Sequence, residues 1–171
     1  ETPELWARAQ RNFMRSCAAY CVARYVLGIG DRHNDNIMCT RDGYLFHIDF
    51  GHFLGNFKSK LGIKRERAPF VFTQQYAEVM GSKKSVMYQE FVTLCCRIFN
   101  VLRRNADLFI TLFHMMTLTG IPELRNEADI NYLRSALHLE MTEVEASRKF
   151  TKLIDEAYNS KATTLNHWIH S

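Results

Sequence analysis

Apolar residues recur at helical intervals along most of the chain, which predicts a mainly α-helical protein. The first pattern ends at Gly28, a natural helix stop, and consists of Trp6, Phe13, Cys17, Tyr20, Cys21 and Tyr25. Further helices are predicted at about 74–80, 86–104, 107–118, 127–138 and 142–158. Thr142 and Glu145 have the spacing of a capping box at the start of the last helix. Four apolar residues are expected to pack as scaffold rather than bind a cofactor: Phe109, Phe113, Met115 and Met116.

A β-hairpin is predicted inside this helical pattern. Residues 36–40 and 44–48 read as two short β-rich runs around an Asp-Gly dipeptide at 42–43, a favoured two-residue hairpin turn. If Arg41 pairs with Tyr44 across this turn, counting back along the two strands places Asn36 opposite Asp49. Side chains that face each other in this way have Cβ atoms about 4.5–5.5 Å apart. That separation suits two oxygen-bearing side chains that reach for one or two hard cations such as Mg²⁺.

Two strings around this hairpin carry the candidate chemistry. Gly-Asp-Arg-His-Asn-Asp-Asn spans 30–36, and His-Ile-Asp-Phe-Gly-His spans 47–52. Asp31 is followed five residues later by Asn36, and the Asp of Asp-Phe-Gly comes thirteen residues after that Asn. Kinase catalytic loops place these residue types at these spacings to hold metal ions on ATP and to orient the acceptor hydroxyl.

The stretch from about Gly28 to Thr73 closely resembles the catalytic and activation loops of phosphoinositide 3-kinases, within the wider lipid-kinase superfamily. The order Asp-Arg-His at 31–33 separates this superfamily from protein kinases, which read His-Arg-Asp. The resemblance implies that 1–171 is an α+β, protein-kinase-like C-terminal lobe in which the hairpin carries the metal ligands. Its catalytic loop would span about 28–36 and its activation loop about 47–73, and the N-terminal lobe would be absent from this chain.

The resemblance also implies a nucleotide site. Asn36 and Asp49 would coordinate Mg²⁺ on ATP, and Met38 and Ile48 match positions that pack beneath adenine. No Gly-rich phosphate loop occurs within residues 1–27, so we expect the missing lobe to supply it and this chain alone to be inactive. The His at position 47 is expected to be structural.

Four residues are candidates for the catalytic step. Asp31 occupies the place of the protein-kinase base, but His33 or His52 is an attractive proton acceptor, since histidine titrates near neutral pH. A cationic histidine would instead stabilise charge on the transferring phosphoryl group. Arg32 is expected to orient groups or to face phosphate. The sequence leaves the choice of general base open.

A basic segment follows the second string. Within the ten residues from 58 to 67 there are five cations and one acid. The cations are Lys58, Lys60, Lys64, Arg65 and Arg67. A solvated loop is one interpretation, but clustered Lys and Arg also bind phosphates through charge-assisted hydrogen bonds. In class I phosphoinositide 3-kinases a similar segment contacts the phosphates of phosphatidylinositol 4,5-bisphosphate, so we expect a substrate headgroup site.

The class assignment contains a conflict. The two strings and the basic segment look like class I, whereas 67–73, 91–97 and the Leu-Asn-His-Trp-Ile-His ending resemble class II. Because selectivity resides in the activation loop, class I is favoured. The alternatives are a protein kinase of the same superfamily, a class II-type kinase acting on phosphatidylinositol or its 4-phosphate, and a pseudokinase-like binding module.

Composition is consistent with a cytosolic globular chain. The 171 residues are 47% hydrophobic, carry a mild net charge of +4 and include five Cys, an odd number that argues for reduced thiols. Neither a signal peptide nor an apolar run of about 20 residues is visible.

We expect a cytoplasmic protein recruited to the inner face of the plasma membrane or to endomembranes. Its expected partners are a phosphoinositide, further domains of the same polypeptide and a regulatory subunit, with no nucleic acid.

Overall fold

The computed structural model describes residues 2–29, 36–48, 54, 68–121, 124 and 127–160. Within these ranges the chain forms six α-helices and a two-stranded antiparallel sheet. In chain order they are α1 (Pro3–Leu27), β1 (Ile37–Cys39), β2 (Leu45–His47), α2 (Gln74–Val79), α3 (Val86–Arg104), α4 (Ala106–Thr117), α5 (Glu127–Leu137) and α6 (Glu143–Asn159). The predicted mainly α fold with an inserted hairpin is confirmed, and α2 to α6 begin and end within one residue of the prediction.

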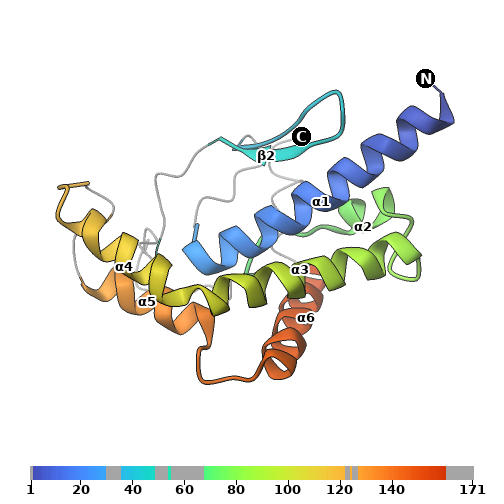
Figure 1. Ribbon diagram of the computed structural model, residues 1–171. Coiled ribbons are helices and arrows are strands. Elements are labelled where there is room, and N and C mark those ends of the chain that lie inside the picture. The colour runs from blue at the N-terminus through green and yellow to red at the C-terminus, as the bar shows by residue number, and fades with distance from the viewer. Residues whose placement is uncertain are drawn as a thin grey trace.

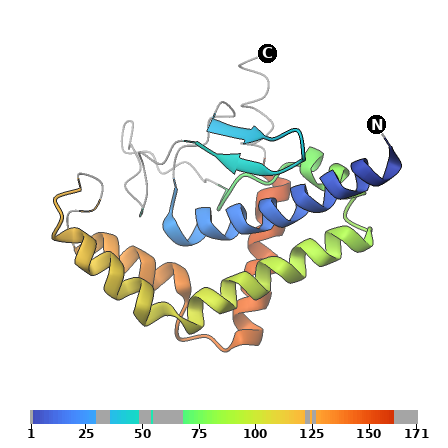
Figure 2. The ribbon, with the colours of Figure 1, turned by 45° about the horizontal axis from the view of Figure 1, so that its top comes forward.

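The elements are arranged in layers around α1. Figures 1 and 2 show α1 between the hairpin on one side and α3 on the other, and α1 contacts both α3 and β2. On its far side α3 packs against α6, which crosses it (Figure 2). The pair α4 and α5 lies at the end of the molecule where α1 finishes (Figure 1). As a result, α1 is the support on which the hairpin rests.

Local sequence signals explain both ends of α1. The Thr2 hydroxyl caps the first turn by accepting a hydrogen bond from the Leu5 N–H, and Pro3 occupies the first helical position. At the other end Gly28 takes the left-handed conformation, with φ of 55°, and its N–H bonds back to the last turn. A Cβ at Gly28 would collide with the ring of Tyr132. The predicted helix end at Gly28 is therefore confirmed.

The core lies between α1, α3 and α6 and is rich in phenylalanine. Phe72 stacks on Phe91 with ring centroids 4.7 Å apart, and Phe99 lies 5.0 Å from Phe150. All four side chains are buried. Such aromatic pairs contribute stability beyond the area that they bury. In the described ranges no helix has the length and apolar character needed to span a bilayer.

Three cysteines belong to this core. Cys17 and Cys21 lie one turn apart on α1, with sulfur atoms 4.0 Å apart, and Cys95 on α3 is also buried. Burial raises the pKa of the Cys17 and Cys95 thiols well above the usual value. Cys17 and Cys21, which the apolar pattern of the first predicted helix includes, are therefore part of the core.

The last two helices confirm one prediction and correct another. Thr142 and Glu145 form the predicted capping box, in which each side chain bonds the other residue's N–H. In contrast, Met115 and Met116 on α4 are 60% and 36% exposed, so their predicted place in a packed face is wrong. Asp107, Thr111 and His114 mark one polar face of α4, but apolar residues cover the rest of its circumference, so the sequence does not show which part of that apolar surface faces a neighbour.

Candidate active site

The hairpin loop has three residues rather than the two predicted. Thr40 and Tyr44 face each other: the Thr40 N–H donates to the Tyr44 carbonyl at 2.9 Å, and the Tyr44 N–H donates to Thr40 Oγ1 at 3.0 Å. Gly43 adopts a φ of 88° at the end of the loop. Three-residue loops that close on a left-handed glycine are a common alternative to the two-residue turn. The predicted two-residue turn is therefore wrong.

The longer loop shifts the strand register by one residue. The structure pairs Ile37 with His47, Met38 with Phe46 and Cys39 with Leu45. The next bond along the ladder runs from the Ile48 N–H to the Asn36 carbonyl at 3.1 Å, so Asn36 lies opposite Ile48. The predicted pairing of Asn36 with Asp49 is wrong. Asp49 itself lies outside the described residues.

This register gathers three predicted site residues on one face of the hairpin. Directly paired residues share a face, and side chains alternate along each strand, so Asn36, Met38 and Ile48 point the same way. Met38 is 47% exposed, Ile48 is 52% exposed, and Asn36 is half-buried. Leu45 and His47 alternate with them and are buried. We call the surface formed by Asn36, Met38 and Ile48 the outward face.

His47 anchors the inward face of the hairpin. Its ring stacks on Tyr20 of α1, with centroids 4.7 Å apart and planes 9° from parallel. Burial, and then the positive charge of Arg24, lower the pKa of His47 to about 4. The imidazole is therefore neutral at pH 7 and points away from the outward face. This geometry fits the structural role that the sequence predicts for it.

A row of side chains on α1 holds the hairpin. Five residues, each four positions after the one before, form what we call the α1 stripe: Arg8, Asn12, Ser16, Tyr20 and Arg24. Residues four apart on a helix share a face. Sequence reasoning assigned Tyr20 to the apolar pattern and missed the other four. Their regular spacing is the signal that could have found them.

The first two members of the α1 stripe contact the hairpin loop. Arg8 forms an exposed ion pair with the Asp42 carboxylate at 3.5 Å. The Asn12 side-chain amide donates to the Asp42 carbonyl at 2.9 Å. Beside them Gly43 approaches the backbone of Ala9 so closely that a Cβ would collide with the Ala9 carbonyl oxygen. The three-residue loop is therefore fitted to α1.

Most of the other predicted site residues lie outside the described ranges. They are the catalytic candidates Asp31, Arg32, His33 and His52, the metal ligand Asp49, and the headgroup candidates Lys58, Lys60, Lys64, Arg65 and Arg67. Their roles stay predictions.

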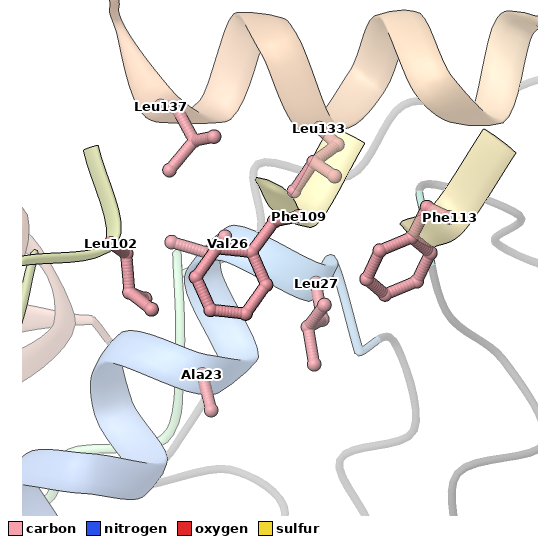
Figure 3. Close-up of a pocket in the computed structure, with 8 residues that line it drawn as sticks. All are labelled: Ala23, Val26, Leu27, Leu102, Phe109, Phe113, Leu133 and Leu137. Carbon is pink, nitrogen blue, oxygen red and sulfur yellow. The ribbon is translucent and has the colours of Figure 1, made fainter. Parts of the chain in front are cut away.

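A cavity of about 210 Å³ lies away from the hairpin, between the end of α1 and helices α3, α4 and α5 (Figure 3). Its lining is entirely apolar: Ala23, Val26, Leu27, Leu102, Phe109, Phe113, Leu133 and Leu137. A nucleotide site needs a few convergent polar groups to orient its ligand. The residues that line this cavity offer none, so we do not assign the nucleotide to it.

Comparison with known proteins decides the family. A family profile described as "Phosphatidylinositol 3- and 4-kinase" matches residues 1–126, a range that contains α1, the hairpin and helices α2 to α4. The chain belongs to this kinase family. The outward face of the hairpin is therefore part of a lipid-kinase-type domain.

Individual relatives cover nearly all of this kinase chain. It is 54% identical to phosphatidylinositol 3-kinase 1 of Dictyostelium discoideum over 96% of its length. It is 48% identical to the human phosphatidylinositol 4-phosphate 3-kinase C2 domain-containing subunit beta over 97%, and 45% identical to the mouse phosphatidylinositol 3-kinase C2 domain-containing subunit gamma over 98%. These matches cover 10%, 10% and 11% of the three relatives, so the chain spans about a tenth of their length.

Proposed function

We propose that this chain forms part of a kinase that uses ATP and Mg²⁺ to phosphorylate the inositol 3-hydroxyl of phosphoinositides. The observation that carries the proposal is the family match over residues 1–126, together with 54% identity to a phosphatidylinositol 3-kinase. The hairpin supports it, because its outward face combines an amide oxygen with exposed apolar side chains.

The chemistry of the outward face fits a magnesium–nucleotide complex. The Asn36 side chain offers a hard oxygen donor of the kind that Mg²⁺ prefers, and Asp49 would add a carboxylate. Met38 and Ile48 would present apolar surface to the adenine ring. When bound, Mg²⁺ neutralises charge on the phosphates during transfer.

The proton of the inositol hydroxyl needs an acceptor, and three residues are candidates. Asp31 stands at the position of the protein-kinase base, and His33 and His52 are the alternatives. Arg32 would face phosphate as a cation. His47 is no candidate, because it is buried on the inward face and stacked on Tyr20.

For the lipid we propose phosphatidylinositol 4,5-bisphosphate, because the basic segment from 58 to 67 offers five cations for its phosphates. Phosphatidylinositol 4-phosphate is the second candidate, since a relative 48% identical to this chain is named a phosphatidylinositol 4-phosphate 3-kinase. Both substrates would place the enzyme at the cytoplasmic face of a membrane. There other domains of the same polypeptide, including a nucleotide-covering lobe, and a regulatory subunit would be its partners.

The full-length protein, incubated with MgATP and vesicles that carry one lipid each, tests this proposal. Phosphatidylinositol, its 4-phosphate and its 4,5-bisphosphate are compared, and the position of the new phosphate is determined. We expect 3-phosphorylation, fastest on the bisphosphate, and a loss of roughly a hundredfold in Asn36→Ala. Asn159→Ala, an equivalent change at an exposed position of α6, is the control. Phosphate transfer to peptide acceptors alone would instead indicate a protein kinase.

A further inference from the structure

The hairpin is too small to hold its own shape. Each of its strands has three residues, and among the described residues its sheet has two strands. An isolated two-stranded hairpin is marginally stable at best in water. Among the described residues, the surface beneath it is the α1 stripe, so we expect the α1 stripe to maintain its geometry.

Ser16 bonds the edge of β2 that faces away from β1. The pairs Thr40–Tyr44 and Asn36–Ile48 are hydrogen-bonded, and bonded pairs alternate with non-bonded pairs along an antiparallel ladder. Leu45, next to Tyr44, therefore belongs to a non-hydrogen-bonded pair, and its N–H points away from β1. Ser16 Oγ accepts a hydrogen bond from this N–H at 2.9 Å and donates to the Asn12 carbonyl at 2.7 Å. The hydroxyl thus links the backbone of β2 to the backbone of α1.

Tyr20 fixes the other end of the same strand. Its ring stacks on His47, which directly precedes Ile48, the residue that bonds to Asn36. Ser16 and Tyr20 are one helical turn apart, and their contacts, Leu45 and His47, are two residues apart on one face of β2. Together the two contacts fix which face of β2 is turned to α1, so Ile48, which alternates with His47, is turned to the outward face.

The turn sequence is also compatible with a second register, which would break up the outward face. The Asp-Gly dipeptide at 42–43 is equally suited to a two-residue turn, which would shift one strand by one residue relative to the other. A shift of one residue turns the side chains of the moved strand to the opposite face. Ile48 would then no longer share a face with Asn36 and Met38.

We propose that Ser16 and Tyr20 are positioning residues for the kinase reaction, which fix β2 on α1 so that Ile48 stays on the outward face beside Asn36 and Met38. The proposal rests on the proposed function, because it assigns the outward face to the magnesium–nucleotide complex. Neither residue touches that face; both act through the backbone and the inward side chain of β2.

Kinetics of the full-length protein test the proposal. The variants Ser16→Ala and Tyr20→Leu remove the two contacts, whereas Ser16→Thr keeps the hydroxyl and Tyr20→Phe keeps the stacking ring. Ser135→Ala removes a helical serine from the exposed side of α5 and is the matched control. For each variant, turnover is measured against Mg²⁺ and against ATP concentration.

We expect Ser16→Ala and Tyr20→Leu to raise the Mg²⁺ concentration for half-maximal activity, and the KM for ATP, by about tenfold. Ser16→Thr, Tyr20→Phe and Ser135→Ala should stay within about twofold of the unchanged protein. A purely structural role would lower the amount of active enzyme and hence kcat alone. Unchanged Mg²⁺ and ATP dependence in both disruptive variants would overturn the proposal.

Amide hydrogen exchange gives a readout that does not need activity. In Ser16→Ala or Tyr20→Leu, the amides of residues 37–48 should exchange at least about tenfold faster, while those of α3 keep their protection. If either Ser16→Ala or Tyr20→Leu does not fold, the exchange result for the other variant tests the proposal. Unchanged exchange at 37–48 would refute the positioning role.

If instead the unchanged protein phosphorylates no phosphoinositide, the proposed function fails, and the exchange result still decides whether α1 holds the hairpin.

Discussion

The ring of His47 lies flat against the ring of Tyr20, with centroids 4.7 Å apart. This contact joins the strand that precedes the Asp-Phe-Gly string to the long helix that precedes the predicted catalytic loop. Because His47 is buried beside Arg24, its pKa falls to about 4. The stack therefore depends on a neutral imidazole, and this makes the hairpin sensitive to acid.

The first prediction concerns pH. An unfolded histidine has a pKa of about 6.5, so the folded hairpin binds fewer protons than the unfolded one between pH 6.5 and about 4. The contribution of His47 to stability is complete above pH 6.5 and is lost as the pH falls through this window, by at most about 1.4 kcal/mol per pH unit. His47→Phe, which keeps an aromatic ring, should remove this part of the pH dependence. Thermal unfolding of the unchanged protein and of His47→Phe at pH 5 and pH 7 measures this difference. An equal pH dependence of stability in the two proteins would contradict the prediction.

The second prediction concerns Gly43. Gly43→Ala places a Cβ against the Ala9 carbonyl at a φ of 88°, so it should separate the loop from α1 and cost about 2–3 kcal/mol. Gly120→Ala is a matched control, because Gly120 has a φ of 76° but nothing within 4 Å of the added carbon. It should cost about 1 kcal/mol. Thermal unfolding of the two variants measures the difference, and equal losses would show that the contact with Ala9 has no effect.

The third prediction concerns the start of α6. Thr142→Ala removes the hydroxyl that accepts the Glu145 N–H, and should lower the free energy of unfolding by about 1 kcal/mol. Thr142→Ser keeps the cap and should be nearly neutral. Denaturant unfolding provides the measurement. A loss in the serine variant as large as in the alanine variant would show that the threonine methyl group, rather than the cap, matters.

The fourth prediction concerns lipid selectivity. Changing Lys64, Arg65 and Arg67 together to Gln should lower turnover of the 4,5-bisphosphate at least about tenfold more than turnover of phosphatidylinositol, because fewer cations remain for the extra phosphates. The equivalent triple change on α6 is the control: Arg148, Lys149 and Lys152 to Gln. Turnover on vesicles of each lipid gives the ratio. Equal losses on both lipids would count against the headgroup site.

Local sequence determined the helices and the chemistry of the candidate site. Caps such as Thr2, Gly28 and the Thr142–Glu145 pair act within a few residues, so they can be recognised without knowledge of the fold. In the same way, the spacing of Asn36 from the Asp-Phe-Gly string predicts kinase chemistry, because the required residue types lie close together in the chain.

Only the tertiary structure decided the hairpin register and the exposure of α4. The Asp-Gly loop is compatible with two lengths, and the longer one is the loop whose Asp42 and Gly43 fit against Asn12 and Ala9 of α1. Likewise, the apolar sequence around Met115 does not show which side of α4 meets a neighbour. In both cases the outcome depends on contacts between residues far apart in the chain, and the local pattern of polar and apolar residues does not reveal such contacts.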